Sequence, residues 1–151
     1  MFMQCGFSAS QAEKLAPALR AKVLEPKRYQ LYPDAVPTLQ ALQRRGYESY
    51  ILSNNYPELE EVVAALGLAP YFKKTLVSAQ IGYDKPRREI FETALQTAGN
   101  PAKAYMIGDN PVDDIQGAKQ AGFSTIVIHT PDAGEADYQA QQLSDILEIL
   151  P

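Results

Sequence analysis

After residue 46, short apolar runs alternate with longer segments in which apolar residues recur at every third or fourth position. The short runs occupy residues 47–53, 74–79, 103–108 and 123–129. Runs of this length that are rich in β-branched and aromatic residues favour strands, whereas the longer spacing favours amphipathic helices. Strands separated by helix-length segments predict an α/β fold, a Rossmann-like parallel sheet with helices on both faces.

Capping signals locate the ends of several predicted helices. Pro57 is placed to open one helix, and Gly67 suits its C-terminus. Asn110 is a good N-cap with Pro111 at the first helical position, and that helix is predicted to end near Gly122. Apolar residues at helical spacing over residues 143–150 predict a closing helix.

The first 33 residues contain no run that favours a strand. Ser10 and Glu13 have the spacing of a capping box, and the following apolar stripe predicts an amphipathic helix. Pro17 falls inside this stripe, so we expect a kink or two shorter helices. A further helix is predicted from Asp34, as its N-cap, to Gly46. The segment before Asp34 is therefore interpreted as a helical accessory piece.

Composition and charge exclude several classes of protein. A net charge of -4, with lysine and arginine scattered along the chain, argues against broad binding to nucleic acid or acidic membranes. The single cysteine, Cys5, leaves no internal disulfide or thiolate metal cluster. No apolar stretch is long enough to span a bilayer, and the N-terminus lacks the features of a signal peptide. We therefore expect a cytoplasmic protein.

Polar side chains that could take part in catalysis or ligand binding follow three of the predicted strands. They are Ser53 and Asn54, then Lys85, then Asp109, Asp113 and Asp114. Each has an ordinary interpretation alone, as a turn, loop or helix-cap residue. Because ligands in such folds bind beyond the carboxyl ends of the strands, these groups are expected to converge in one cleft. A hydroxyl, an amine and several carboxylates suit a phosphoryl group bound through Mg²⁺.

The order and spacing of these groups resemble a known family. Residues 50–55 (YILSNN), 82–91 (GYDKPRREIF) and 106–122 (MIGDNPVDDIQGAKQAG) are similar to motifs II, III and IV of the haloacid dehalogenase (HAD) superfamily of phosphohydrolases. The resemblance extends from about Tyr32 to the C-terminus. It implies a HAD-like α/β core over residues 32–151 and a remnant of a helical cap over residues 1–31.

The resemblance also implies roles for individual residues. Ser53 would hydrogen-bond the transferring phosphoryl group of a small phosphorylated metabolite, and Asn54 would help to shape that pocket. Lys85 would neutralise phosphoryl and carboxylate charge. Asp109 would ligate Mg²⁺ directly, while Asp114, with Asp113 as a possible helper, would orient the metal shell and Lys85. Ser53, Asn54 and Lys85 are thus the expected substrate-binding residues, and Asp109 and Asp114 the expected metal residues.

The sequence departs from the family at motif I, an Asp-x-Asp segment that supplies the nucleophile and the general acid/base. No Asp-x-Asp occurs in the 151 residues. Because motif I also supplies metal ligands, Mg²⁺ binding is expected to be weak or absent. The leading hypothesis is therefore a truncated Mg²⁺-dependent phosphatase scaffold that is inactive alone. A non-catalytic binding module on the same scaffold is the alternative. A flavodoxin-like or receiver-like domain is less favoured, because its acidic cluster lies early in the chain.

The absent motif I strand would lie between the strands that end at Ser53 and Gly108. An α/β core without its first strand leaves backbone groups of both neighbours unpaired, and exposed strand edges recruit other chains. We expect one of two repairs. Either residues 47–53 pair directly with residues 103–108, or a second copy covers the gap and forms a homodimer.

Overall fold

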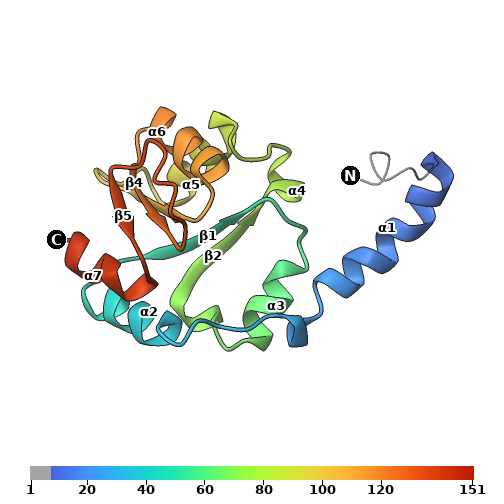
Figure 1. Ribbon diagram of the computed structural model, residues 1–151, viewed down its shortest axis with the longest axis horizontal. Coiled ribbons are helices and arrows are strands. Elements are labelled where there is room, and N and C mark those ends of the chain that lie inside the picture. The colour runs from blue at the N-terminus through green and yellow to red at the C-terminus, as the bar shows by residue number, and fades with distance from the viewer. Residues whose placement is uncertain (1–7) are drawn as a thin grey trace.

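The β-favouring runs form strands, and every strand pair in the described part of the chain is parallel. The computed structural model describes residues 8–151, so residues 1–7, with Cys5, lie outside it. The strands are β1 (Ser49–Ser53), β2 (Phe72–Val77), β3 (Tyr105–Gly108), β4 (Ser124–Ile128) and β5 (Tyr138–Ala140). The predicted parallel α/β architecture is confirmed (Figure 1), while β5 was not predicted.

The strands form two sheets. β1 pairs with β2, and β4 lies between β3 and β5. Within residues 8–151, β1 and β3 are not hydrogen-bonded to each other, so each has one edge without a strand partner. The direct pairing of residues 47–53 with residues 103–108, one of the two expected repairs, is therefore not present in this structure.

Helices cover both faces of the strands and bury the apolar stripes that the sequence displays. They are α2 (Ala35–Arg44), α3 (Leu59–Ala65), α4 (Ser78–Ile81), α5 (Arg88–Thr97), α6 (Gly117–Gln120) and α7 (Ile146–Ile149). α5 and α6 lie on one side of the strands, with α2 and α7 on the other (Figure 1). Phe91 of α5 packs in a cluster with Met106 of β3, and Leu42 of α2 packs in a cluster with Ile126 of β4.

The predicted cap at Asn110 is confirmed, and the one at Asp34 is partly wrong. The Asn110 side chain accepts hydrogen bonds from the backbone N–H groups of Val112 and Asp113. The first six residues of this helix, Pro111–Gln116, form a π-helix that continues into α6. Asp34 occupies the N-cap position of α2 without capping it. Its carboxylate instead accepts a hydrogen bond from Ser144 N–H, 2.9 Å away.

The N-terminal helix differs from its prediction in two ways. α1 runs unbroken from Ala9 to Val23 with Pro17 inside it, so the expected division into two shorter helices is wrong. Its capping box joins Ser8 and Gln11, not Ser10 and Glu13. Pro17 is exposed, so water can replace the helical hydrogen bond that proline removes.

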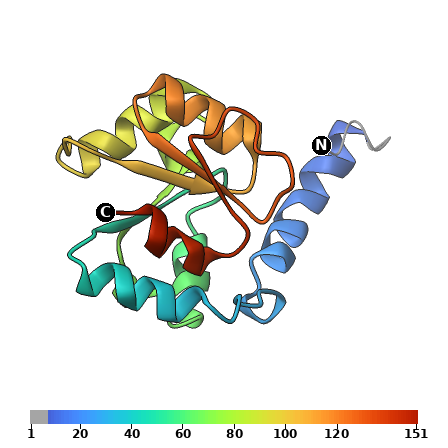
Figure 2. The same cartoon turned by 60° about the vertical axis from the view of Figure 1, so that its left-hand side comes forward.

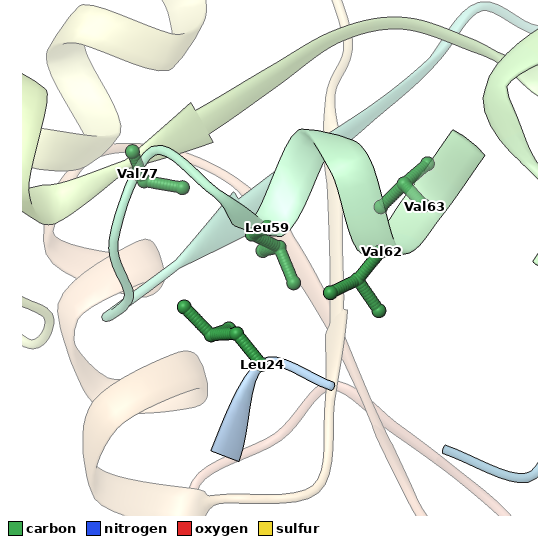
Figure 3. Packing of buried hydrophobic residues seen from close by; sticks show 5 residues of the cluster. All are labelled: Leu24, Leu59, Val62, Val63 and Val77. Atoms are coloured by element: carbon green, nitrogen blue, oxygen red, sulfur yellow. The ribbon is translucent and has the colours of Figure 1, made fainter. Parts of the chain in front are cut away.

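α1 stands out from the α/β core in both views and is docked through its C-terminal end (Figures 1 and 2). Leu24, just after α1, is buried in a cluster with residues of α3 and β2 (Figure 3). The buried members of this cluster are Leu24, Leu59, Val62, Val63 and Val77. Among the described residues, no helix combines the length and apolar character needed to cross a membrane.

Candidate functional site

Asn54 connects the end of β1 to the loop between α4 and α5. Ser53 is the last residue of β1 and is half-buried, and Asn54 follows it on the surface. Lys85 N–H donates to Asn54 Oδ1 at 2.7 Å, and Asn54 Nδ2 donates to the Lys85 carbonyl oxygen at 3.0 Å. The Asn54 side chain therefore binds the backbone of the predicted lysine.

The Lys85 side chain reaches from this loop to the carboxyl end of β1 and to the helical segment that follows β3. Its Nζ donates to the carbonyl oxygen of Leu52 in β1 at 3.1 Å and to Asp114 Oδ1 at 2.5 Å. The side chains of Lys85 and Asp114 are 12% and 7% exposed, so water screens the pair little. Charge-assisted bonds of this kind are stronger than neutral ones, and they hold the ammonium in place.

Asp114 is held in place by its own neighbours as well as by Lys85. Its Oδ2 accepts a hydrogen bond from Asn110 N–H at 3.1 Å. The carboxylate lies against the last residue of β3, because a β-carbon built on Gly108 would be 2.3 Å from Asp114 Oδ2. Only glycine leaves room for the carboxylate at this strand end. Both Asp114 oxygens are thus engaged with protein donors.

Gly117 supports the Lys85 loop and was not anticipated from the sequence. A β-carbon at this position would lie 2.3 Å from the Pro86 carbonyl oxygen and 2.5 Å from the Phe91 ring. The loop therefore packs directly on the backbone of α6, three residues after Asp114. A glycine inside a helical pattern signals close packing, and that signal was available. The role of the Leu52 carbonyl oxygen has no signature in the sequence, because every residue carries such a group.

The outer side of the same loop is exposed and charged. Arg87 donates to Glu89 at 2.7 Å, and its guanidinium lies 4.8 Å from the centre of the Tyr83 ring. The hydrogen bond from Arg87 lowers the pKa of Glu89 below its ordinary value. This exposed ion pair contrasts with the buried Lys85–Asp114 pair behind it.

The carboxylates available for a cation form only part of a metal site. Asp109 follows β3 and is exposed, and Asp113 is half-buried, with Oδ2 accepting from Asn110 Nδ2 at 3.1 Å. Across residues 8–151, no three or more His, Cys, Asp or Glu side chains gather closely enough to hold a metal ion. Mg²⁺ requires near-octahedral oxygen coordination and commonly uses one or two carboxylates together with waters and phosphate oxygens. The described residues do not assemble a complete site.

The chain has polar side chains at the carboxyl ends of parallel strands, which is the edge where α/β proteins commonly bind ligands. A family model described as haloacid dehalogenase-like hydrolase matches residues 6–122. The chain belongs to this family. The structure is similar to that of a HAD phosphatase from Thermococcus onnurineus, with a TM-score of 0.77 and 31% identity, covering 83% of this chain and 60% of that one.

Characterised relatives include phosphatases of small molecules. The chain is 37% identical to a phosphoserine phosphatase of Thermus thermophilus over 82% of its own length and 49% of the relative's. It is 33% identical to a glyceraldehyde 3-phosphate phosphatase of Methanothermobacter thermautotrophicus, over 66% of this chain and 45% of the relative. The chain thus spans about half the length of these curated relatives.

Another solved structure bears on the cofactor. The HAD-hydrolase YfnB of Bacillus subtilis, described as bound to magnesium, is 27% identical, with a TM-score of 0.73. The match covers 80% of this chain and 56% of that one.

Proposed function

We propose that this chain is a HAD-type phosphohydrolase scaffold for a small phosphorylated metabolite, in the cytoplasm, and that it does not turn over substrate alone. Residues 32–151 form the HAD-like core in this proposal, and residues 1–31 are the remnant of a helical cap. The observation that carries the proposal is the largely buried Lys85 side chain, whose ammonium is held between the Leu52 carbonyl oxygen of β1 and Asp114, which follows β3. Family membership and the phosphatase activity of the relatives support it.

The proposed roles follow the chemistry of each group. The Ser53 hydroxyl donates a hydrogen bond to a phosphoryl oxygen, and the Lys85 ammonium offsets phosphoryl charge. Asp114 holds Lys85 in position through the 2.5 Å contact. Asp109 contributes an oxygen ligand to Mg²⁺, and the metal would supply further charge neutralisation when its remaining ligands are provided.

The proposed lack of turnover has a chemical reason. Phosphoryl transfer in this family's mechanism needs an aspartate nucleophile and a second aspartate as acid/base, and the 151-residue sequence contains no Asp-x-Asp. Loss of a nucleophile or base removes several orders of magnitude in rate and leaves only electrostatic stabilisation. Lys85 and Ser53 would then orient a phosphoryl group without an acceptor for it.

Complementation provides the test. The chain is assayed with Mg²⁺ and a panel of small phosphate monoesters, alone and co-expressed with the part of the Thermus relative that lies outside the match. We expect no turnover above background for the chain alone and measurable turnover for the mixture. Lys85→Ala and Asp109→Ala should abolish the restored activity, while Lys27→Ala, at an exposed position away from β1 and β3, should retain it.

Two results would contradict the proposal. Steady turnover by the chain alone that disappears in Asp109→Ala would require a nucleophile elsewhere in the sequence. Restored turnover that survives both Lys85→Ala and Asp109→Ala would show that these residues do not form the site. Ser53→Ala separates the hydroxyl from the ammonium, because it leaves the Lys85–Asp114 pair intact.

The second candidate function is a non-catalytic interaction module, and the open edges of β1 and β3 favour it. Each strand is paired on one side only within the described residues. Unpaired strand edges are templates for association, so a second copy of this chain is the proposed partner. Light scattering should show a dimer at micromolar concentration. A stable monomer would reject this candidate and leave the phosphohydrolase scaffold unaffected.

A further inference from the structure

The Asn54 carboxamide is paired with the peptide groups of Lys85 through both of its polar atoms. Oδ1 accepts from Lys85 N–H at 2.7 Å, and Nδ2 donates to the Lys85 carbonyl oxygen at 3.0 Å. A carboxamide carries the same donor and acceptor as a peptide group, so Asn54 bonds to Lys85 as a neighbouring strand would. The pairing fastens the Lys85 backbone to the carboxyl end of β1.

The Lys85 loop depends on this pairing because its own backbone bonds are few. Pro86 has no N–H to donate. Within the loop, Arg87 N–H donates to the Asp84 carbonyl oxygen at 3.0 Å. The contact of Pro86 with Gly117 holds one side of the loop, and Asn54 holds the other.

The Lys85 side chain extends from this loop to two hydrogen-bond partners that hold its ammonium in place. Its Nζ bonds to the Leu52 carbonyl oxygen and to Asp114, and the side chain is 12% exposed. A long lysine side chain loses considerable rotamer entropy when its end is fixed, so a fixed backbone reduces the freedom that must be removed. We infer that Asn54 is the positioning residue for Lys85, and that its carboxamide directs the ammonium to the Leu52 carbonyl oxygen and Asp114.

The inference rests on the proposed function only in one respect, the role of the Lys85 ammonium in offsetting phosphoryl charge. Asn54 acts through Lys85 and needs no contact with a substrate in this role. The donor and acceptor requirement makes the role specific to the carboxamide. Aspartate at position 54 keeps an acceptor for Lys85 N–H, but it loses the donor and brings negative charge to the Lys85 carbonyl oxygen.

Competitive acylation of amines, read by mass spectrometry on the whole chain, measures the position of Lys85 directly. The readout is labelling of Lys85 relative to Lys27, whose side chain is 76% exposed. We expect Asn54→Ala to raise this ratio about fivefold, because loss of a hydrogen bond frees the ammonium for a larger fraction of the time. Asn54→Asp should raise it by a smaller factor.

Asn55→Ala is the matched control. Asn55 accepts from Tyr56 N–H at 2.8 Å and makes no hydrogen bond to Lys85 among the described residues, so its loss should leave the ratio unchanged. An unchanged ratio in folded Asn54→Ala overturns the inference. If that variant unfolds, all lysines label faster together, and folded Asn54→Asp decides: an unchanged ratio there also overturns the inference.

The measurement uses no phosphate compound, so its outcome is separable from the proposed function. If complementation fails but the labelling ratio depends on Asn54, the positioning role is supported and the phosphohydrolase assignment is rejected. The opposite result is also possible: the restored activity requires Lys85, but the labelling of Lys85 does not change in the Asn54 variants. That result would support the phosphohydrolase assignment and reject the positioning role.

Discussion

β4 and β1 are parallel strands of five residues with opposite surroundings. β4 pairs on both sides and has three fully buried residues in its centre, whereas β1 pairs with β2 alone and is half-buried along its whole length. β4 is therefore held by its ladder and its core, and β1 by one ladder and by side chains near its carboxyl end. The difference indicates that the candidate site residues near the carboxyl end of β1 also stabilise this strand, which is paired on one side only.

The largest expected effect comes from breaking the connection between the two sheets. The Lys85 side chain is 12% exposed, and Asp114→Ala leaves its ammonium without the carboxylate partner. Removal of one member of a buried ion pair typically costs about 3–5 kcal/mol. Urea unfolding should show this loss of stability. In the double variant Lys85→Met with Asp114→Leu, most of the loss should be recovered. A loss below about 1 kcal/mol in Asp114→Ala, the value typical of surface pairs, would mean that the pair does not join the sheets.

A matched pair of isoleucines tests the comparison within the strands. Ile126 in β4 is 0% exposed, and Ile51 in β1 is half-buried. Ile126→Ala should destabilise the fold by about 3 kcal/mol, because it leaves a cavity in addition to the lost burial. Ile51→Ala should cost about 1 kcal/mol, since part of its surface already meets water. Equal losses in urea unfolding would remove the distinction between β4 and β1.

The start of β4 gains a further support that depends on pH. Asp137 accepts hydrogen bonds from Lys119 and from the backbone and hydroxyl groups of Thr125. These bonds lower the pKa of Asp137 below its ordinary value, and the Lys119 bond lowers it most. A lowered folded-state pKa stabilises the fold above the unfolded value, and this contribution is lost as pH falls through the folded value.

Asp137→Asn removes this dependence on pH. At pH 7 the variant should be less stable than the parent protein in urea unfolding, and the difference should shrink as the pH is lowered toward 2. A constant difference between Asp137→Asn and the parent across this pH range would refute the support by Asp137.

The smallest expected effect concerns α1, which has even less support than β1. The Arg20 guanidinium lies 4.1 Å from the centre of the Tyr56 ring and forms an ion pair with Glu58, at a part-exposed position. Exposed pairs contribute about 0.2–1 kcal/mol and weaken with salt. Arg20→Ala should therefore lower stability by less than about 1 kcal/mol, and 1 M NaCl should reduce the difference. A loss as large as that of Ile126→Ala would mean that α1 belongs to the core.

Strong periodic signals in the sequence predicted much of the fold. The runs that became β1 to β4 are rich in β-branched and aromatic residues, and Asn110 with Pro111 carries a specific helix-start signal. β5 was not predicted because only one of its three residues, Ala140, is buried. The short helix Ser78–Ile81 was not predicted because four residues are too few to show a helical period of apolar positions.

The candidate site was predictable in its side chains but not in its backbone partners. Lys85 and Asp114 follow different strands, and parallel topology brings such residues to one edge. The sequence does not indicate that Lys85 bonds to the Leu52 carbonyl oxygen, or that the Asn54 carboxamide is spent on the Lys85 backbone. These contacts depend on loop conformation, which long-range packing decides. The functional roles of all the predicted site residues, Ser53, Asn54, Lys85, Asp109 and Asp114, stay predictions.

Gly108 shows how tolerance to mutation is distributed around this site. The residue has no functional group, yet even the methyl group of alanine would occupy the place of the Asp114 carboxylate. In a saturation library, position 108 should therefore be as restrictive as the charged positions beside it. Selection for the chemistry of one side chain extends in this way to the empty volume next to it, and a glycine can be fixed by a function in which it takes no part.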